Sequence, residues 1–380
     1  MMRFATILKN PARWMLGPEV HPQVVVSSRI RLARNLADAS FPGRAVVEER
    51  RRVLDRVFPA LESLGEMRDA FARPLDELNA VEKKVLVERH LISREQAGNA
   101  SGSGVVINRA QSLSIMVNEE DHLRMQAMFP GLALHPAHAA LDAVDTALEE
   151  KLDFAFDDKL GFLTSCPSNV GTGLRASVMV HLPGLVLSDQ VNKVVAAVNK
   201  IGLAVRGLFG EGSEAQSNLF QVSNQTTLGE SESDIIDRLT KVIEQVISSE
   251  LNARAKLLED KPGILCDHIG RAYGILRHSR IIDTKEALNH LSMLRLGMDL
   301  GFLPALPNGD SIELLLMDIQ PAHLQWQSRS KLTPEQRDGL RSCILRERLS
   351  LLPEPEIRHP SFNGTDEPPS DVESNQPEDS

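Results

Sequence analysis

Cysteine is scarce in this chain, and the three residues present lie far apart, at Cys166, Cys266 and Cys343. Their number is odd and no two of them form a C-x-x-C pair, which argues against a disulfide framework and against a zinc site. We therefore expect the protein to work in a reducing compartment, with no metal bound by its own side chains.

Long hydrophobic runs are also missing. No apolar stretch reaches the length of a membrane-spanning helix, and no basic, apolar and small-residue signal pattern opens the chain. The composition, 42% hydrophobic and 25% charged over 380 residues, is sufficient for two domains with cores of their own. We expect a cytoplasmic protein without a membrane partner.

An excess of basic charge is absent too. The formal net charge is −10, but residues 353–380 alone hold eight acidic residues and one basic residue, a net charge of −7 that leaves −3 for the other 352 residues. A near-balanced body with an acidic tail gives no support for nucleic-acid binding. Six prolines and little apolar surface in the same tail predict that residues 353–380 are disordered.

The rest of the chain divides into regions of different character. After an N-terminal extension of residues 1–23, short β-like runs alternate with amphipathic helices over 24–259, and Lys261-Pro262-Gly263 then breaks the pattern. Residues 264–352 have a predominantly helical pattern, with start signals at Asp283 and at Thr333-Pro334. Over 24–259 the β-like runs lead into polar patches, so we expect strand ends to present the chemistry.

Arginines recur in these patches, at Arg29, Arg31, Arg124, Arg175 and Arg206. A planar, permanently charged guanidinium makes bidentate bonds to phosphate oxygens, so a ring of them can hold a nucleoside triphosphate without a Walker-type loop. Carboxylates stand in the same patches, at Glu120 and Glu211. Carboxylates beside such a site can grip a cationic substrate.

Each patch alone also has an ordinary explanation. Arg29 and Arg31 lie two apart and so share one face of an extended strand, which a solvated edge strand would also show. The run Asn118-Glu119-Glu120-Asp121-His122 is typical of a solvated turn. The run from Cys166 to Arg175 is more specific, because Gly171 and Gly173 permit a close approach of backbone to ligand.

The four patches together, in this order, resemble the catalytic domain of the phosphagen (guanidino) kinases over roughly residues 24–259. The resemblance implies an α+β fold, in which an antiparallel sheet flanked by helices is followed by an all-helical C-terminal domain over 264–352. It implies ATP as the nucleotide, with Mg²⁺ bound through it.

The resemblance also assigns roles to residues. Glu120 and Glu211 match the carboxylates that hold the reactive guanidinium, and Cys166 matches a thiol beside it. His90 alone would be an ordinary surface or core histidine; the family match makes it a nucleotide ligand. The nucleotide-binding positions that the resemblance implies are Ser27, Ser28, Arg29, Ile30, Arg31, His90, Arg124, Arg175, Ala176, Ser177, Val178, Met179, Arg206, Gly207, Leu208, Phe209, Gly210 and Glu211.

Within that superfamily, residues 86–93, 218–225 and 319–325 resemble the bacterial protein arginine kinases of the McsB type. Only 26 residues precede Ser27, where phosphagen kinases carry a small helical domain that helps to close over a free guanidine. We therefore expect a more open site that admits an arginine of another polypeptide. The branch implies protein substrates with exposed arginine, an activator protein and a Clp-type protease as partners, and leaves a homodimer open.

A further motif lies near the C-terminus, where residues 337–342 resemble the R-D-x-x-R-A phosphoarginine-binding motif of that branch, with Ser342 in place of alanine. Arg337 and Arg341 are four apart and so share a helix face, where two guanidinium groups could clamp a phosphate. An ordinary exposed helix face with an Asp-to-Arg pair gives the same pattern. The predicted allosteric site consists of Arg337, Asp338, Arg341 and Ser342.

The predicted function is the transfer of the γ-phosphoryl group of ATP to the guanidinium of arginine residues in proteins. Arginine is a poor nucleophile because its pKa exceeds ~12 and its lone pairs are delocalised. Glu120 would align the reactive nitrogen and accept its proton while Glu211 fixes the opposite edge; the sequence does not distinguish which carboxylate is the base. Two alternatives keep part of the pattern: a kinase of free arginine or another small guanidine, and a non-catalytic phosphoarginine reader.

Overall fold

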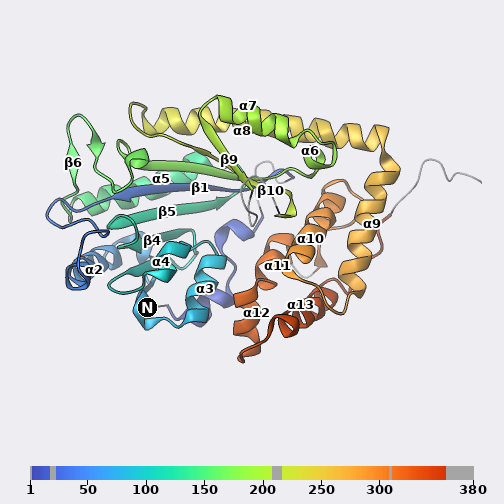
Figure 1. Cartoon of the computed structure of the whole chain (residues 1–380), viewed down its shortest axis with the longest axis horizontal. Helices are drawn as coiled ribbons and strands as arrows, with labels where there is room; N and C mark the ends of the chain where they lie inside the picture. The colour runs from blue at the N-terminus through green and yellow to red at the C-terminus, as the bar shows by residue number, and fades with distance from the viewer. Residues whose placement is uncertain (1, 18–22, 208–215, 308–309, 357–380) are drawn as a thin grey trace, which may run out of the picture.

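An antiparallel sheet forms the centre of the computed structural model (Figure 1). The structure describes residues 2–17, 23–207, 216–307 and 310–356. The eight strands of the sheet follow the order β2-β3-β4-β5-β1-β8-β10-β9, and every neighbouring pair is antiparallel. These strands are β1 Val25–Arg34, β2 Phe71–Pro74, β3 Gly104–Ile107, β4 Leu113–Val117, β5 Leu123–Pro130, β8 Leu174–His181, β9 Leu203–Gly207 and β10 Leu219–Asn224. A small separate hairpin pairs β6 Phe156–Asp157 with β7 Gly161–Phe162.

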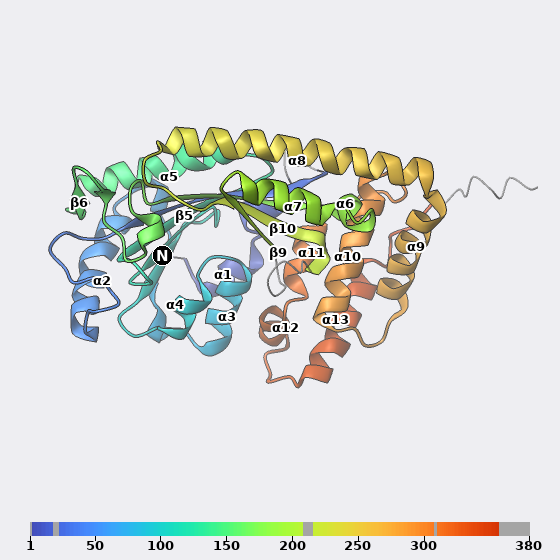
Figure 2. The ribbon, with the colours of Figure 1, turned by 45° about the horizontal axis from the view of Figure 1, so that its top comes forward.

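Helices cover both faces of the sheet. In chain order they are α1 Phe4–Lys9, α2 Val47–Glu62, α3 Ala80–Glu88, α4 Arg94–Gly98, α5 Leu134–Glu149, α6 Pro183–Leu187, α7 Val191–Lys200, α8 Glu232–Asp260, α9 Pro262–His278, α10 Thr284–Asp299, α11 Ile312–Asp318, α12 Pro321–Ser328 and α13 Pro334–Arg348. Figure 2 shows α5 and α8 above the sheet, with α1, α3 and α4 and the bundle α9–α13 below it. No described helix is long and apolar enough to cross a membrane.

Strand alternation separates the two faces. Ile30 and Leu32 of β1 point into the core that α5 and α8 cover, while the residues between them face the other side. A second core joins α9, α10, α11 and α13 to the opposite face at one end of the sheet, through Val26, Met179 and Leu219. The predicted α+β fold with an antiparallel sheet and a helical C-terminal region is confirmed.

The helix start signals are confirmed as well. Asp283 accepts a hydrogen bond from the backbone N–H of Glu286 and caps α10. Thr333 and Gln336 form a reciprocal capping box at α13, with Pro334 at its first position. Helix α8 ends at Asp260, its C-cap Lys261 has φ of −141° and ψ of 48°, and α9 begins directly after it. The domain limits themselves stay predictions.

Two expectations about local structure need correction. The first arginine patch, Arg29 and Arg31, does not stand at a strand end. It lies within β1, which continues to Arg34 between β5 and β8. Gly171 and Gly173 have positive φ, but a Cβ there would meet Thr227 O at 2.7 Å and Ala33 O at 2.6 Å. These glycines let the chain approach itself rather than a ligand. Of the predicted tail, residues 353–356 are described, and residues 357–380 lie outside the described residues.

Candidate active site

The five arginines predicted from the sequence come from four strands and lie on the sheet face opposite α5 and α8. Strand alternation explains this, because each has at least one apolar neighbour in sequence that packs in the other core. Arg31 stands opposite Arg175 across β1 and β8, and Arg206 stands opposite Gln221 across β9 and β10. Neighbouring strands are only about 4.8 Å apart, so the guanidinium groups gather on one surface.

Other members of the predicted nucleotide set point away from this surface. Ile30, Ala176 and Val178 are fully buried in the core beneath α5 and α8. The hydroxyl of Ser28 donates to Gly131 O at 2.8 Å and accepts from the backbone N–H of Ala133. A bound nucleotide on the arginine face therefore cannot reach these side chains.

Neutral polar side chains on the same face support the arginines. Gln221 Oε1 accepts from Arg29 Nη2 at 2.8 Å, and Ser177 Oγ lies 3.4 Å from Arg29 Nε. Ser223 Oγ accepts from Arg175 Nη2 at 3.4 Å. Sequence reasoning missed Gln221 and Ser223 as site residues, although their spacing of two on β10 is a signal of a shared strand face.

The cluster is electrostatically unbalanced. Within the four described stretches of chain, Glu119 is the one carboxylate in an ion pair with any of the five arginines, at 2.7 Å from Arg124 Nη1. Burial, together with the charges of Arg124 and Arg175, lowers the pKa of Arg29 to about 10. The pKa of Arg175 is also lowered, by burial first and then by Arg206 and Arg124. Such mutual repulsion favours binding of a polyanion.

His90 borders this cluster in a left-handed backbone conformation, with φ of 59°. Its carbonyl oxygen accepts from Gln126 Nε2, and its ring lies 5.9 Å from that of Trp14. Burial, with the nearby charges of Arg29 and Arg94, lowers the His90 pKa to about 4. The imidazole is therefore neutral near pH 7.

The acidic patch forms the tight turn between β4 and β5. Asp121 fixes this turn by accepting hydrogen bonds from Asn35 Nδ2 and from the backbone N–H of Ser165, both at 2.7 Å. Glu120 stands exposed at its tip, and its pKa is raised by partial desolvation and by the neighbouring charges of Asp121 and Glu119. An exposed carboxylate of raised pKa is suited to contact a substrate cation and to accept a proton.

Cys166 lies close to the acidic turn. Ser165, its neighbour in sequence, donates through its hydroxyl to Glu120 O at 2.8 Å. The Cys166 thiol is partly exposed, lies 3.0 Å from Ser168 Oγ and is close to Arg175. The structure thus brings together Glu120, Cys166 and the arginine face. Leu208, Phe209, Gly210 and Glu211 lie outside the described residues.

A cleft of about 2340 Å³ opens over the arginine face. The five arginines and His90 line its floor, and α3, α4, α12 and the segment before α13 form its walls. The helical region joins this cleft through Glu88 of α3, which accepts from the backbone N–H groups of Ala322 and His323 at the start of α12. The cleft therefore lies between the two regions of the chain.

The residues of the motif at 337–342 lie in two different environments, the cleft and the interior of the helical region. Arg337 lines the cleft and donates to Leu332 O. Arg341 is 1% exposed and donates to Ile319 O at 3.0 Å, Ile282 O at 2.8 Å and Asp338 Oδ1 at 2.5 Å. The Ser342 hydroxyl lies within hydrogen-bond reach of the main-chain oxygens of Arg280 and Gly339 and donates its one proton there. Arg341 is thus no exposed surface residue, and the phosphate clamp stays a prediction.

Comparison with known proteins agrees with this geometry. Residues 52–253 match the family described as ATP:guanido phosphotransferase, C-terminal catalytic domain, and residues 262–360 match the protein-arginine kinase McsB C-terminal domain. The protein-arginine kinase of Halothermothrix orenii is 46% identical over 91% of this chain and 98% of its own length. That of Halalkalibacterium halodurans is 46% identical over 92% and 98%, and that of Moorella thermoacetica is 45% identical over 90% and 99%.

Solved structures show the same fold. Lombricine kinase is 25% identical, with a TM-score of 0.54, and the match covers 66% of this chain and 71% of that one. The duplicated taurocyamine kinase from Schistosoma mansoni with bound transition state analog components is 24% identical, with a TM-score of 0.56 over 80% of this chain and 51% of that one. From its catalytic region to its C-terminal helices, the chain belongs to the protein-arginine kinase family of the ATP:guanido phosphotransferases.

Proposed function

We propose that the protein is an ATP-dependent protein arginine kinase that transfers the γ-phosphoryl group to arginine side chains of other proteins. The observation that carries the proposal is the arginine face, in which Arg124 alone of the five guanidinium groups has an ion-paired carboxylate among the described residues. A nucleoside triphosphate supplies the anionic charge that such a face lacks. The relatives named protein-arginine kinase support the choice of acceptor.

In the proposed reaction, a bond forms between a guanidinium nitrogen and the γ-phosphorus as the bond from that phosphorus to the ADP oxygen breaks. The nitrogen loses one proton, and Glu120 is placed to accept it. Glu211 would hold the other edge of the guanidinium. The arginines bind and orient the phosphates, so that in-line positioning and charge stabilisation supply most of the catalysis.

Mg²⁺ would neutralise charge on the phosphates when bound. In the described parts of the chain, one group of His, Asp and Glu ligand atoms lies within 4.8 Å of one another, formed by His138, Asp142 and Glu232. These residues stand on α5 and α8, on the other side of the sheet from the arginines. We therefore propose that the nucleotide phosphates, rather than protein carboxylates, carry the ion.

The family resemblance supports finer proposals. We propose a cytoplasmic location, an activator protein, a Clp-type protease that acts on the phosphorylated product, and a phosphoarginine site that includes Arg337 and Arg341. A homodimer is compatible with all of these.

The decisive experiment is mass spectrometry for acid-labile phosphoarginine after incubation of the protein with MgATP and a mixed protein substrate, with free arginine in a parallel reaction. We expect phosphoarginine on protein and little on the free amino acid. Arg175→Lys keeps the charge but loses the planar fork and should remove most activity, whereas Arg271→Lys, on an exposed face of α9, should not. Efficient phosphorylation of free arginine alone would contradict the proposal.

A further inference from the structure

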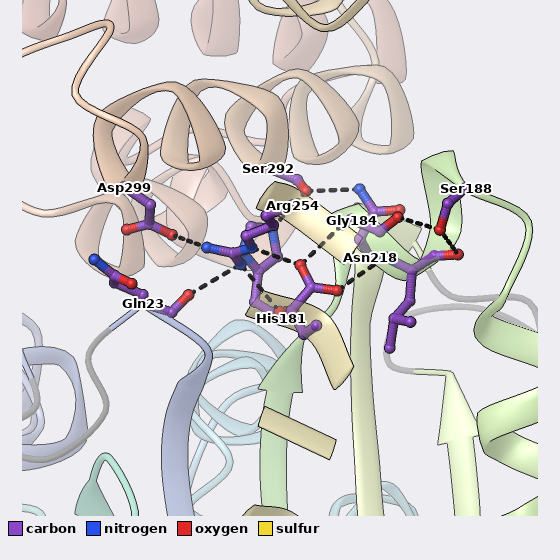
Figure 3. Close-up of polar contacts among 10 residues, drawn as sticks. Gln23, His181, Gly184, Ser188, Asn218, Arg254, Ser292 and Asp299 are labelled. Carbon is purple, nitrogen blue, oxygen red and sulfur yellow. Dashed lines mark hydrogen bonds and ion pairs between the residues drawn. The ribbon is translucent and has the colours of Figure 1, made fainter. Parts of the chain in front are cut away.

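Helix α10 of the helical region contacts the catalytic sheet at a cluster of polar side chains, which we call the Ser292 junction: Ser292 and Asn289 of α10 with His181, Ser217 and Asn218 of the sheet region. Ser292 Oγ accepts from Asn218 Nδ2 at 2.8 Å and lies 2.7 Å from His181 Nε2. Asn289 Oδ1 accepts from the backbone N–H of Ser217 at 2.9 Å. Figure 3 shows Ser292 between Asn218 and His181, at the ends of two strands.

The chemistry of Asn218 fixes the direction of its bond to Ser292. An amide nitrogen can only donate, so Asn218 occupies one acceptor position of the hydroxyl, whose proton is free to be donated to His181 Nε2. Burial, followed by the charges of Arg295 and Arg254, lowers the His181 pKa well below its ordinary value. The imidazole is therefore neutral and able to accept. Ser292 itself is buried, so water does not replace a lost bond readily.

The backbone held by this junction is strained. Ser217 and Asn218 have φ of 59° and 53°, and two successive non-glycine residues in the left-handed region are uncommon. The Asn218 carbonyl oxygen also accepts from the backbone N–H of Leu182, just after β8. Strain of this kind persists where surrounding bonds enforce it, and α10 supplies two of them here.

Strand β10 begins directly after this turn and carries the side chains that hold the arginines. Gln221 lies three residues beyond Asn218 and bonds Arg29, and Ser223 lies five residues beyond and bonds Arg175. A shift of the turn would move both of these partners. The path from the helical region to the phosphate-binding face thus consists of one turn and one strand.

We propose that Ser292 and Asn289 are positioning residues: through the turn at Ser217 and Asn218 they fix β10, and through β10 they set the arginines that bind the nucleotide. The inference rests on the proposed function for its kinetic consequence only. It assigns to the helical region a direct influence on phosphoryl transfer, separate from any phosphate bound at Arg337.

The test compares Ser292→Ala and Asn289→Ala with Lys285→Ala, an exposed position on the same helix, and with Asn289→Asp, which keeps the acceptor oxygen. We expect hydrogen exchange in residues 217–224 to quicken in both junction variants while exchange in β3 and β4 stays unchanged. We also expect kcat/KM for ATP to fall about tenfold in Ser292→Ala, with recovery in Asn289→Asp relative to Asn289→Ala.

Equal exchange and equal kcat/KM in Ser292→Ala and Lys285→Ala would overturn the inference. So would a uniform rise in exchange throughout the sheet with unchanged kcat/KM, because that result describes a structural bond without a positioning role. If the wild-type protein forms no phosphoarginine, the proposed function fails, and exchange in 217–224 together with ATP affinity still decides whether the junction positions the arginine face.

Discussion

Two adjacent carboxylates in the turn after β4 differ in their surroundings. Glu119 is buried, and although burial alone raises its pKa, the charge and hydrogen bonds of Arg124 outweigh this and lower it. Glu120 is exposed and has no such ion pair with a described residue, and its pKa is raised. One residue therefore belongs to the arginine face, and the other is available to an incoming guanidinium.

The pH profile of the reaction should report Glu120. A carboxylate must be ionised to accept a proton, so kcat/KM should fall as the pH drops through a pKa above the ordinary value for glutamate. Glu120→Gln should lose this acid limb and about a hundredfold of activity at neutral pH, as measured by initial rates from pH 5 to 9. Glu95→Gln, which removes a nearby charge in the cleft, should keep the limb at a slightly lower pH. An unchanged limb in Glu120→Gln would assign the proton to another group.

At this scale the sequence was informative where residue type and spacing alone decide the geometry. Arg29 and Arg31 share a face because they are two apart, and the structure adds Gln221 and Ser223 by the same rule. The nucleotide set predicted from the sequence included Ile30, Ala176 and Val178 because the family resemblance covers continuous runs of residues. Successive side chains of a strand point to opposite faces, so these three lie in the core on the other side of the sheet.

Among the elements, α13 begins with a reciprocal capping box. Thr333 Oγ1 accepts from the backbone N–H of Gln336, and Gln336 Oε1 accepts from that of Thr333. Both bonds satisfy groups that a helix start otherwise leaves without partners. The same helix supplies Arg337 to the cleft.

Removing this cap should destabilise the helical region. Thr333→Ala is expected to lower the free energy of unfolding by about 1 kcal/mol, measured by urea titration. Ser248→Ala is the matched control, because Ser248 is exposed to solvent and its hydroxyl donates to the carbonyl oxygen of Glu244, one turn earlier in α8. A Thr333→Ala variant as stable as Ser248→Ala would show that the capping box contributes nothing measurable.

Helix starts could be predicted because their chemistry is local, but the end of α8 could not. The apolar stripe predicts a helix over residues 234–251, and the structure continues it to Asp260. The extra turns are stabilised by Arg254, which bonds Glu250 at 2.6 Å and Asp299 of α10 at 3.1 Å. A partner 45 residues away in sequence leaves no signal in the periodicity of the helix itself.

At the scale of the whole molecule, the two regions meet around Arg254, which also donates to the main-chain oxygens of Gln23 and His181 (Figure 3). Burial raises the pKa of Asp299 to about 6, although Arg295 and Arg254 act in the opposite direction. A carboxyl group with a raised pKa binds its proton more tightly in the folded state than in the unfolded state.

This contact should make stability depend on pH. The stability that Asp299 contributes is present below the unfolded pKa of about 4 and is lost as the pH rises through about 6. The unfolding free energy of the wild-type protein, relative to that of Asp299→Asn, should therefore fall from pH 4 to 6 and stay level above pH 7. Denaturant titrations at each pH measure it. A shift in the opposite direction would mean that the arginines outweigh burial at Asp299.

Helix α8 belongs to both regions at once, since it is about 43 Å long. Its residues from Ile235 to Ala253 fill the core between α8 and the sheet, while Leu258 packs against the core of the helical region. The boundary between the two matched family regions falls at its last turns. An exchange of helical regions between members of the family would therefore have to carry Glu250, Arg254 and Leu258 with it, and the chain that received them would need a glycine at 184, where a Cβ would come within 2.8 Å of Arg254 Cγ. Recombination between family members can succeed only when the residue at 184 is compatible with the residues at 250, 254 and 258, so we expect the two regions to be inherited together.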